Sequence, residues 1–156
     1  MKYLIKYSLT FVFISSLILF SGCSKEPMTP TKIKINEIRI TNFLPNDGTS
    51  SWDPFNGNPD IYVQLYYGTT LLYESNNAED ATPSQGPYID NLSSNPIELI
   101  YPSAEYTIRL YDYDVLDGDD YMGGIIFTPL TTGNPSTIFL DAGTGTTFEL
   151  DVSYEY

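Results

Sequence analysis

Residues 112–123 constrain this chain more than any other stretch, because they place five carboxylates within nine residues: Asp112, Asp114, Asp117, Asp119 and Asp120. Like charges at this density repel one another, and a folded chain tolerates them best when a cation neutralises them. Oxygen ligands in a flexible loop suit Ca²⁺, which takes about six to eight oxygens, better than a soft or strongly geometric metal. The stretch therefore predicts a calcium-binding loop, and the alternative is an acidic turn that is simply solvated.

Short alternating segments separated by turn residues fill the chain after residue 31. Thr, Ile, Val and aromatic residues, among them 14 Tyr and 8 Phe, are abundant there, as strands prefer. The isoleucines of the first segment change parity: they occupy odd positions up to Ile35 and even positions from Ile38 onward. This change predicts a β-bulge near Asn36 and Glu37. We expect an all-β, antiparallel, eight-stranded sandwich, with strands at 32–43, 60–67, 70–73, 97–101, 106–113, 124–128, 136–140 and 147–156 and an optional short one at 88–89.

The first residues indicate an export signal that is not part of the fold. Two lysines precede an apolar run at residues 9–20, and a Ser-Gly cleavage site follows just ahead of Cys23, the only cysteine. Residues 20–23 (Phe-Ser-Gly-Cys) resemble a bacterial lipobox, in which signal peptidase cuts before the cysteine and lipids are attached to it. The alternative is a plain secretory signal followed by an incidental cysteine.

The predicted organisation is a lipoprotein signal peptide at 1–22, a lipidated cysteine with a flexible tether at 23–31, and one domain at 32–156. Lys25 and Glu26 resemble the surface-export signals of Bacteroidetes-type lipoproteins. We expect an exported chain anchored by lipid to a bacterial membrane, namely the outer membrane, where it could be exposed at the cell surface.

Charge and composition exclude several classes of function. The net charge is −13, and removal of residues 1–22, which hold two lysines and no acids, makes it −15. This charge argues against nucleic acid and against unassisted binding to anionic lipid. The chain has no histidine, so a Ser-His-Asp triad, a Cys-His pair and a histidine zinc site are excluded. We predict no enzymatic activity, the alternative being glycoside hydrolysis by paired carboxylates.

The acidic loops resemble those of C2 domains, a family of calcium-dependent lipid-binding β-sandwiches. The third calcium loop of that family has an Asp-x-Asp pair, an aspartate six residues later and a glycine three beyond it, and this spacing recurs at Asp112, Asp114, Asp120 and Gly123. Asp60, followed by Ile-Tyr-Val, resembles the family's second aspartate, which opens a strand. One strand before the first loop and three after the last resemble the family's permuted, second topology.

The resemblance implies a site for one to three Ca²⁺ ions with side-chain ligands from the first and third loops: Asp53, Asp60, Asp112, Asp114 and Asp120. Asp47 competes with Asp53 for the first-loop position. The Tyr113 carbonyl is a further available ligand, and Asp117 and Asp119 either ligate or tune the local field. Residues i and i+2 at a strand end project to one side, so Asp112 and Asp114 can converge on one ion.

Two kinds of partner are compatible with such a calcium site. The resemblance implies docking on phospholipid, with Trp52, Phe55, Val115 and Leu116 entering the membrane interface. The alternative is a calcium-stabilised surface module that binds a protein or a glycan. A solvent-facing row of aromatic residues on a sheet would favour a glycan, whereas aromatic residues crowded at the loop tips would favour lipid.

Overall fold

The computed structural model describes residues 28–156 with the exception of residues 53–56 and 116–117. The predictions for the signal peptide and for Cys23, Asp53, Phe55, Leu116 and Asp117 fall outside the described residues and stay predictions. Within the described ranges, no helix has the length and apolar character that crossing a membrane requires.

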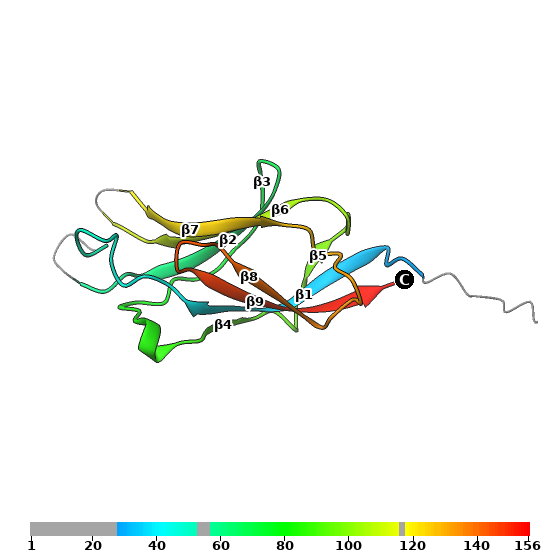
Figure 1. Ribbon diagram of the computed structural model, residues 1–156, viewed down its shortest axis with the longest axis horizontal. Coiled ribbons are helices and arrows are strands. Elements are labelled where there is room, and N and C mark those ends of the chain that lie inside the picture. Colours follow the sequence, from blue (N-terminus) through cyan, green and yellow to red (C-terminus); the bar gives the residue numbers. More distant parts are fainter. Residues whose placement is uncertain (1–27, 53–56, 116–117) are drawn as a thin grey trace, which may run out of the picture.

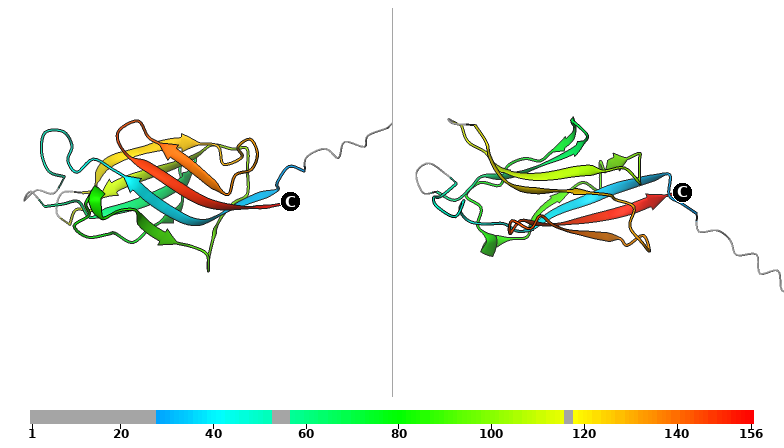
Figure 2. Two further views of the ribbon diagram at one scale, coloured as in Figure 1. Left: turned by 60° about the horizontal axis from the view of Figure 1, so that its bottom comes forward. Right: turned by 45° about the horizontal axis from the view of Figure 1, so that its top comes forward.

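Two antiparallel sheets pack face to face (Figures 1 and 2). The elements are β1 (Lys32–Asn42), β2 (Ile61–Tyr67), β3 (Thr70–Glu74), a 3-10 turn η1 (Pro83–Gln85), β4 (Tyr88–Asn91), β5 (Ile97–Leu99), β6 (Tyr106–Asp112), β7 (Asp120–Phe127), β8 (Thr137–Asp141) and β9 (Thr147–Glu155). One sheet has the order β4-β1-β9-β8, with β5 also paired to β1, and the other has the order β3-β2-β6-β7. The predicted antiparallel β-sandwich is confirmed.

The sandwich has nine strands in its described part, which corrects the prediction of eight: the optional short strand at 88–89 is present as β4. Both β4 and β5 are antiparallel to β1: β4 pairs with residues 37–40 and β5 with residues 33–35. Between them, Leu92 N donates to Asn36 O at 2.8 Å, at the bulge of β1. The bulge therefore divides what would otherwise be one edge strand into two short strands.

The change of parity in β1 has the predicted cause. The pairing of β1 with β9 shifts register between Ile35 and Glu37, which is the bulge expected from the isoleucine pattern. Ile35 before the shift and Ile38 after it are both buried, with exposed fractions of 0% and 1%. The bulge allows both halves of β1 to direct isoleucines into the same core between the sheets.

β7 begins at Asp120, four residues before the expected start at residue 124. The shift in pairing between Leu110 and Tyr111 accommodates the extra residues, so Tyr121 lies opposite Tyr111 and Asp120 lies opposite Asp112. Gly123 makes this path possible, with φ of +143° and with Thr144 Oγ1 only 2.6 Å from where a Cβ would stand. Asp120 therefore lies on a strand and not in the loop.

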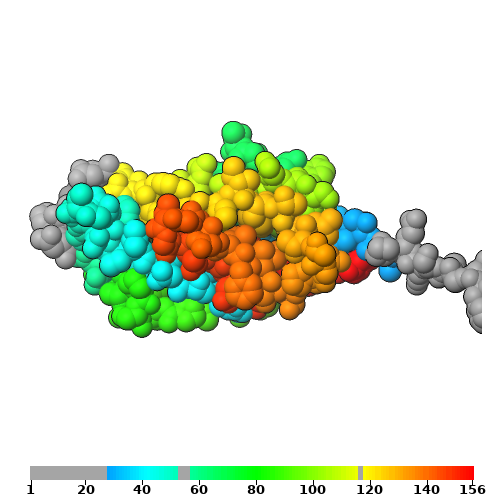
Figure 3. Space-filling view, viewed as in Figure 1, coloured from blue at the N-terminus to red at the C-terminus, as the bar shows by residue number. Residues whose placement is uncertain are grey.

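The loops and the C-terminus occupy opposite ends of the sandwich. The described parts of the first loop (residues 43–60), the second loop (residues 75–87) and the third loop (residues 113–119) gather at one end, here called the loop end (Figure 1). The first described residues and the C-terminus lie at the other end, where Thr31 N donates to Glu155 O at 2.7 Å. Figure 3 shows the cyan first loop beside the yellow start of β7 at the loop end.

Candidate calcium site

Three predicted ligands meet where β2, β6 and β7 approach the loop end. Asp112, the last residue of β6, is fully buried, and its Oδ1 accepts a hydrogen bond from Asp60 N at 2.6 Å. In the strand pairing, Asp112 lies opposite Ile61, the first residue of β2, and opposite Asp120, the first residue of β7. Asp60, Asp112 and Asp120 thus lie at neighbouring strand ends, although they are distant in sequence.

Asp60 connects all three loops. Its carbonyl oxygen accepts from Tyr113 N of the third loop at 3.0 Å, and its Oδ1 accepts from Asp80 N of the second loop at 2.8 Å. The prediction did not include Asp80, which has a φ of +50°. The signal in the sequence was the acidic pair Glu79-Asp80 within a loop, since Asp tolerates positive φ better than most residues.

The third loop is closed by Asp119. Its Oδ1 accepts from Asp114 N at 3.2 Å, and its Oδ2 accepts from the Tyr62 hydroxyl at 2.5 Å. Burial, followed by the hydrogen bond to Asp119, raises the pKa of Tyr62 well above its ordinary value. Asp119 therefore holds the third loop against β2 and brings Asp114 close to the strand ends.

Asp47 already has several donors within the first loop. Its Oδ1 accepts from Ser50 N at 2.6 Å and from Thr49 N at 2.7 Å. These hydrogen bonds, the one from Ser50 foremost, lower the pKa of Asp47 to about 2. A calcium ion would have to compete with this turn for the Asp47 carboxylate, whereas the competing candidate, Asp53, is outside the described residues.

The described residues predicted to touch a membrane differ in exposure. Val115 is 82% exposed at the tip of the third loop. Trp52 is half-buried, packs against the core cluster and donates from Nε1 to Leu44 O at 2.8 Å. Trp52 therefore contributes to the packing of the first loop, while Val115 is free to contact another surface.

The ion pairs recorded among the described residues do not involve the loop-end aspartates. Every ion pair recorded in this part of the chain uses Lys32, Lys34 or Arg39, which belong to β1. Arg109 lies on the other sheet, with its guanidinium carbon 4.9 Å from the centre of the Tyr66 ring. The loop end thus gathers carboxylates, and a bound cation would relieve their repulsion.

The donor set fits calcium in its chemistry. Carboxylate oxygens and the Tyr113 carbonyl are the hard ligands that Ca²⁺ prefers. In the ranges that the structure describes, no three acidic, cysteine or histidine side chains are already grouped as a metal site. Asp60 and Asp112 accept backbone N–H groups instead, so calcium ligation by them requires side-chain rearrangement and stays a prediction.

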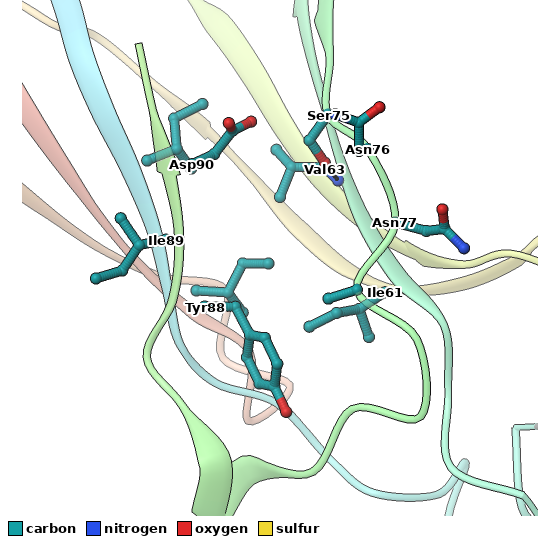
Figure 4. Close-up of a pocket in the computed structure, with 11 residues that line it drawn as sticks. Ile61, Val63, Ser75, Asn76, Asn77, Tyr88, Ile89 and Asp90 are labelled. Atoms are coloured by element: carbon teal, nitrogen blue, oxygen red, sulfur yellow. Dashed lines mark hydrogen bonds between the residues drawn. The ribbon is translucent and has the colours of Figure 1, made fainter. Parts of the chain in front are cut away.

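Another pocket lies between the sheets, and none of the predicted ligands is among its lining residues. It has a volume of about 250 Å³, and its lining includes Ile61, Val63 and Tyr88. Asp90 and Tyr88 point into it from β4, whereas Ile89 points away (Figure 4). Because the Asp90 carboxylate accepts from the Tyr73 hydroxyl at the edge of the sandwich, Asp90 is a suitable control for the loop-end aspartates.

Comparison with solved structures identifies the fold. A structure described as that of a C2 domain superposes with a TM-score of 0.56 at 12% identity, covering 80% of this chain and 98% of the other. The chain has a C2-like fold. The calcium-bound C2 domains of extended synaptotagmin 2 give a TM-score of 0.51 at 18% identity, covering 81% of this chain and 46% of theirs.

Human GIVD cytosolic phospholipase A2 is also similar, with a TM-score of 0.55 at 14% identity over 83% of this chain. The match covers only 17% of the phospholipase chain, so the chain corresponds to a small part of that enzyme. No family model and no curated protein sequence matches the chain. At these identities the likeness establishes the fold alone.

Proposed function

We propose that the chain is a non-enzymatic calcium-binding module on a lipid-anchored surface protein, and that its loop end docks on phospholipid. The observation that carries the proposal is the meeting of Asp60, Asp112 and Asp120 at three neighbouring strand ends. Acidic residues held at neighbouring strand ends by a sheet can supply the oxygen ligands that Ca²⁺ requires. The calcium-bound state of the extended synaptotagmin 2 domains, which share the fold, supports the same ion.

In this proposal, Asp60, Asp112, Asp114 and Asp120 hold calcium, together with Asp53 of the first loop. The bound ion supplies positive charge to an acidic surface and makes contact with a lipid phosphate favourable. Val115, at the tip of the third loop, adds apolar contact with the interface. Asp119 keeps the third loop in position through Tyr62 and Asp114.

The position of the predicted anchor bears on which membrane is bound. The described chain starts at the end opposite the loops, so a tether from Cys23 would leave the sandwich there (Figure 1). The loop end then faces away from the anchoring membrane. We expect the docked phospholipid to belong to a second surface.

A calcium titration of the full chain in detergent micelles tests the ligand assignment. Asp112→Asn and Asp114→Asn should each weaken calcium affinity by about tenfold or more, because each removes an anionic ligand. Asp90→Asn changes a carboxylate on β4 that accepts from Tyr73 and is not a proposed ligand, so it should leave the affinity unchanged. Equal affinities for all three variants would show that the ligand assignment is wrong.

Two further measurements test calcium and lipid separately. Calcium at about one hundred times its dissociation constant should stabilise the fold by about 2.7 kcal/mol relative to EGTA, by mass action. Sedimentation with vesicles of phosphatidylserine and phosphatidylcholine should require calcium and should be lost in Asp112→Asn. Calcium binding without vesicle binding would keep the metal site and refute lipid docking.

A further inference from the structure

A second pocket opens beside the loop end, on the outer face of the sheet β3-β2-β6-β7. It has a volume of about 280 Å³. Its walls come from β2, β3, the start of the second loop and the third loop, and include Tyr62, Gln64, Glu74, Asn77, Tyr113 and Asp119. The pocket shares Tyr113 and Asp119 with the third loop, whereas Asp60, Asp112, Asp114 and Asp120 are not among its lining residues.

The lining of this pocket is made of groups that bind hydroxyls. Gln64 Nε2 donates to Glu74 Oε2 at 2.7 Å and Gln64 Oε1 accepts from the Tyr66 hydroxyl, whereas Asn77 is an exposed lining residue. Amides offer both donors and acceptors, and carboxylates accept two or more hydrogen bonds each. No lysine or arginine is among the lining residues in the described part of the chain. The lining therefore disfavours a phosphate or another anion.

A row of tyrosines leads from the pocket across the sheet. The rings of Tyr62 and Tyr111 stack with centroids 5.5 Å apart at 22°, and the rings of Tyr111 and Tyr121 meet at 5.6 Å and 63°. Tyr121, on β7, is 54% exposed, and Tyr113, at the pocket itself, is 45% exposed. Exposed tyrosines offer an apolar ring surface together with a hydroxyl that hydrogen-bonds.

Arg109 contacts the tyrosines Tyr111 and Tyr66 on the same sheet. Its Nη1 donates to the Tyr111 hydroxyl at 3.4 Å, and its guanidinium lies over the Tyr66 ring. Among the described lysines and arginines, it is the one that forms no recorded ion pair with a carboxylate. Its other N–H groups therefore add donors next to the tyrosines.

We infer that this face binds a neutral oligosaccharide, with one sugar ring in the pocket and its neighbours along the tyrosine row. Sugar rings present C–H faces that pack on tyrosine rings, and their hydroxyls pair with amides and carboxylates. The net charge of −13 disfavours polyanionic glycans. The mostly polar lining disfavours lipid chains. The pocket adjoins the proposed calcium site through Tyr113 and Asp119, but Asp60, Asp112, Asp114 and Asp120 do not line it.

Isothermal titration of the full chain with neutral tetrasaccharides of glucose, mannose or galactose tests the inference. At least one should bind, and Asn77→Ala and Tyr121→Ala should each weaken it by about tenfold, the effect of losing one or two polar or ring contacts. Both side chains are exposed, so neither variant should impair folding. The matched controls, Asn95→Ala and Tyr101→Ala, change exposed residues outside the pocket and should bind normally.

Calcium variants separate this inference from the proposed function. Asp112→Asn, measured in EGTA, should still bind the tetrasaccharide. Asn77→Ala and Tyr121→Ala should in turn retain calcium-dependent sedimentation with vesicles. Failure of all three tetrasaccharides to bind at millimolar concentration, preference for an acidic tetrasaccharide of galacturonate, or normal binding by both pocket variants would overturn the inference.

Discussion

The outer faces of the two sheets differ in how their polar groups are satisfied. On the sheet that contains β1 and β9, Arg39 donates to Glu37 at 2.5 Å, to Glu149 at 2.7 Å and to Asp151 at 2.5 Å. Beside the termini, Lys32 pairs with Glu98 at 2.8 Å. The opposite sheet carries stacked tyrosines across β2, β6 and β7 instead.

The two faces differ in the kind of contact that holds neighbouring strands together. On the β1–β9 face, cations and carboxylates on neighbouring strands bind one another, as cross-strand pairs of opposite charge do. On the tyrosine face, ring contacts, close backbone pairing and hydrogen bonds such as those from Tyr62 to Asp119 and from Tyr66 to Gln64 hold the structure together. Three substitutions test whether the two faces depend on these different interactions.

The largest effect is expected from Gly124→Ala on the tyrosine face. A Cβ on Gly124 would lie 2.5 Å from Ile108 O and 3.1 Å from Arg109 Cα, which are backbone atoms that cannot rotate away. Separating β6 from β7 to make room should lower the free energy of unfolding by about 2 kcal/mol. Urea denaturation measures this loss. Gly86→Ala, whose nearest contact would be at 3.4 Å, is the control and should be close to neutral.

A smaller loss is expected from Arg39→Ala on the ion-paired face. The substitution leaves Glu37, Glu149 and Asp151 close together without their shared cation, and should lower the melting temperature by roughly 5 °C. Arg109→Ala removes a cation from the tyrosine face but deprives no carboxylate of a recorded ion-pair partner, so the shift in melting temperature should be clearly smaller. High salt should reduce the Arg39 effect by screening the repulsion. Equal shifts for both arginines would remove the distinction between the faces.

The smallest expected effect is an alkaline loss of stability at Tyr62. Burial raises the pKa of Tyr62, so the folded state favours the protonated hydroxyl. The stability that this preference contributes is complete below the unfolded pKa near 10. It is lost as pH rises from there toward the folded pKa, and the loss is about 1.4 kcal/mol at pH 11.

Tyr62→Phe isolates this effect, because phenylalanine does not titrate. The difference in free energy of unfolding between the unchanged chain and the variant should fall by about 1.4 kcal/mol between pH 8 and pH 11. Urea unfolding at both values measures it. A constant difference would mean that Tyr62 ionises as readily in the folded chain as in the unfolded one.

The sequence was most informative where a pattern is local. The parity change between Ile35 and Ile38 correctly predicted a bulge, because side chains alternate along any strand. The start of β7 was predicted four residues late, since an acidic segment has no apolar alternation to mark a strand. Pairing with β6, including Asp120 opposite Asp112, makes this segment a strand.

Contacts between segments far apart in sequence could not be predicted in the same way. The hydrogen bond from Tyr62 to Asp119 spans 57 residues, and the one from Asp80 to Asp60 joins two loops. Neither residue pair has a spacing that indicates contact, and only the packing of the strands brings them together. The pocket inferred to bind sugar, with walls from two strands and two loops, depends on the same packing.

The sequence by itself therefore determined the β character of the chain, the acidity of its loops and the spacing of Asp112, Asp114 and Asp120. The tertiary structure decided that Asp60 meets Asp112, that charged pairs cover one sheet, and that tyrosines line the other. The physical reason is that alternation fixes which face of a strand each residue occupies. The pairing register and the order of the strands, which decide its neighbours, depend on the whole core.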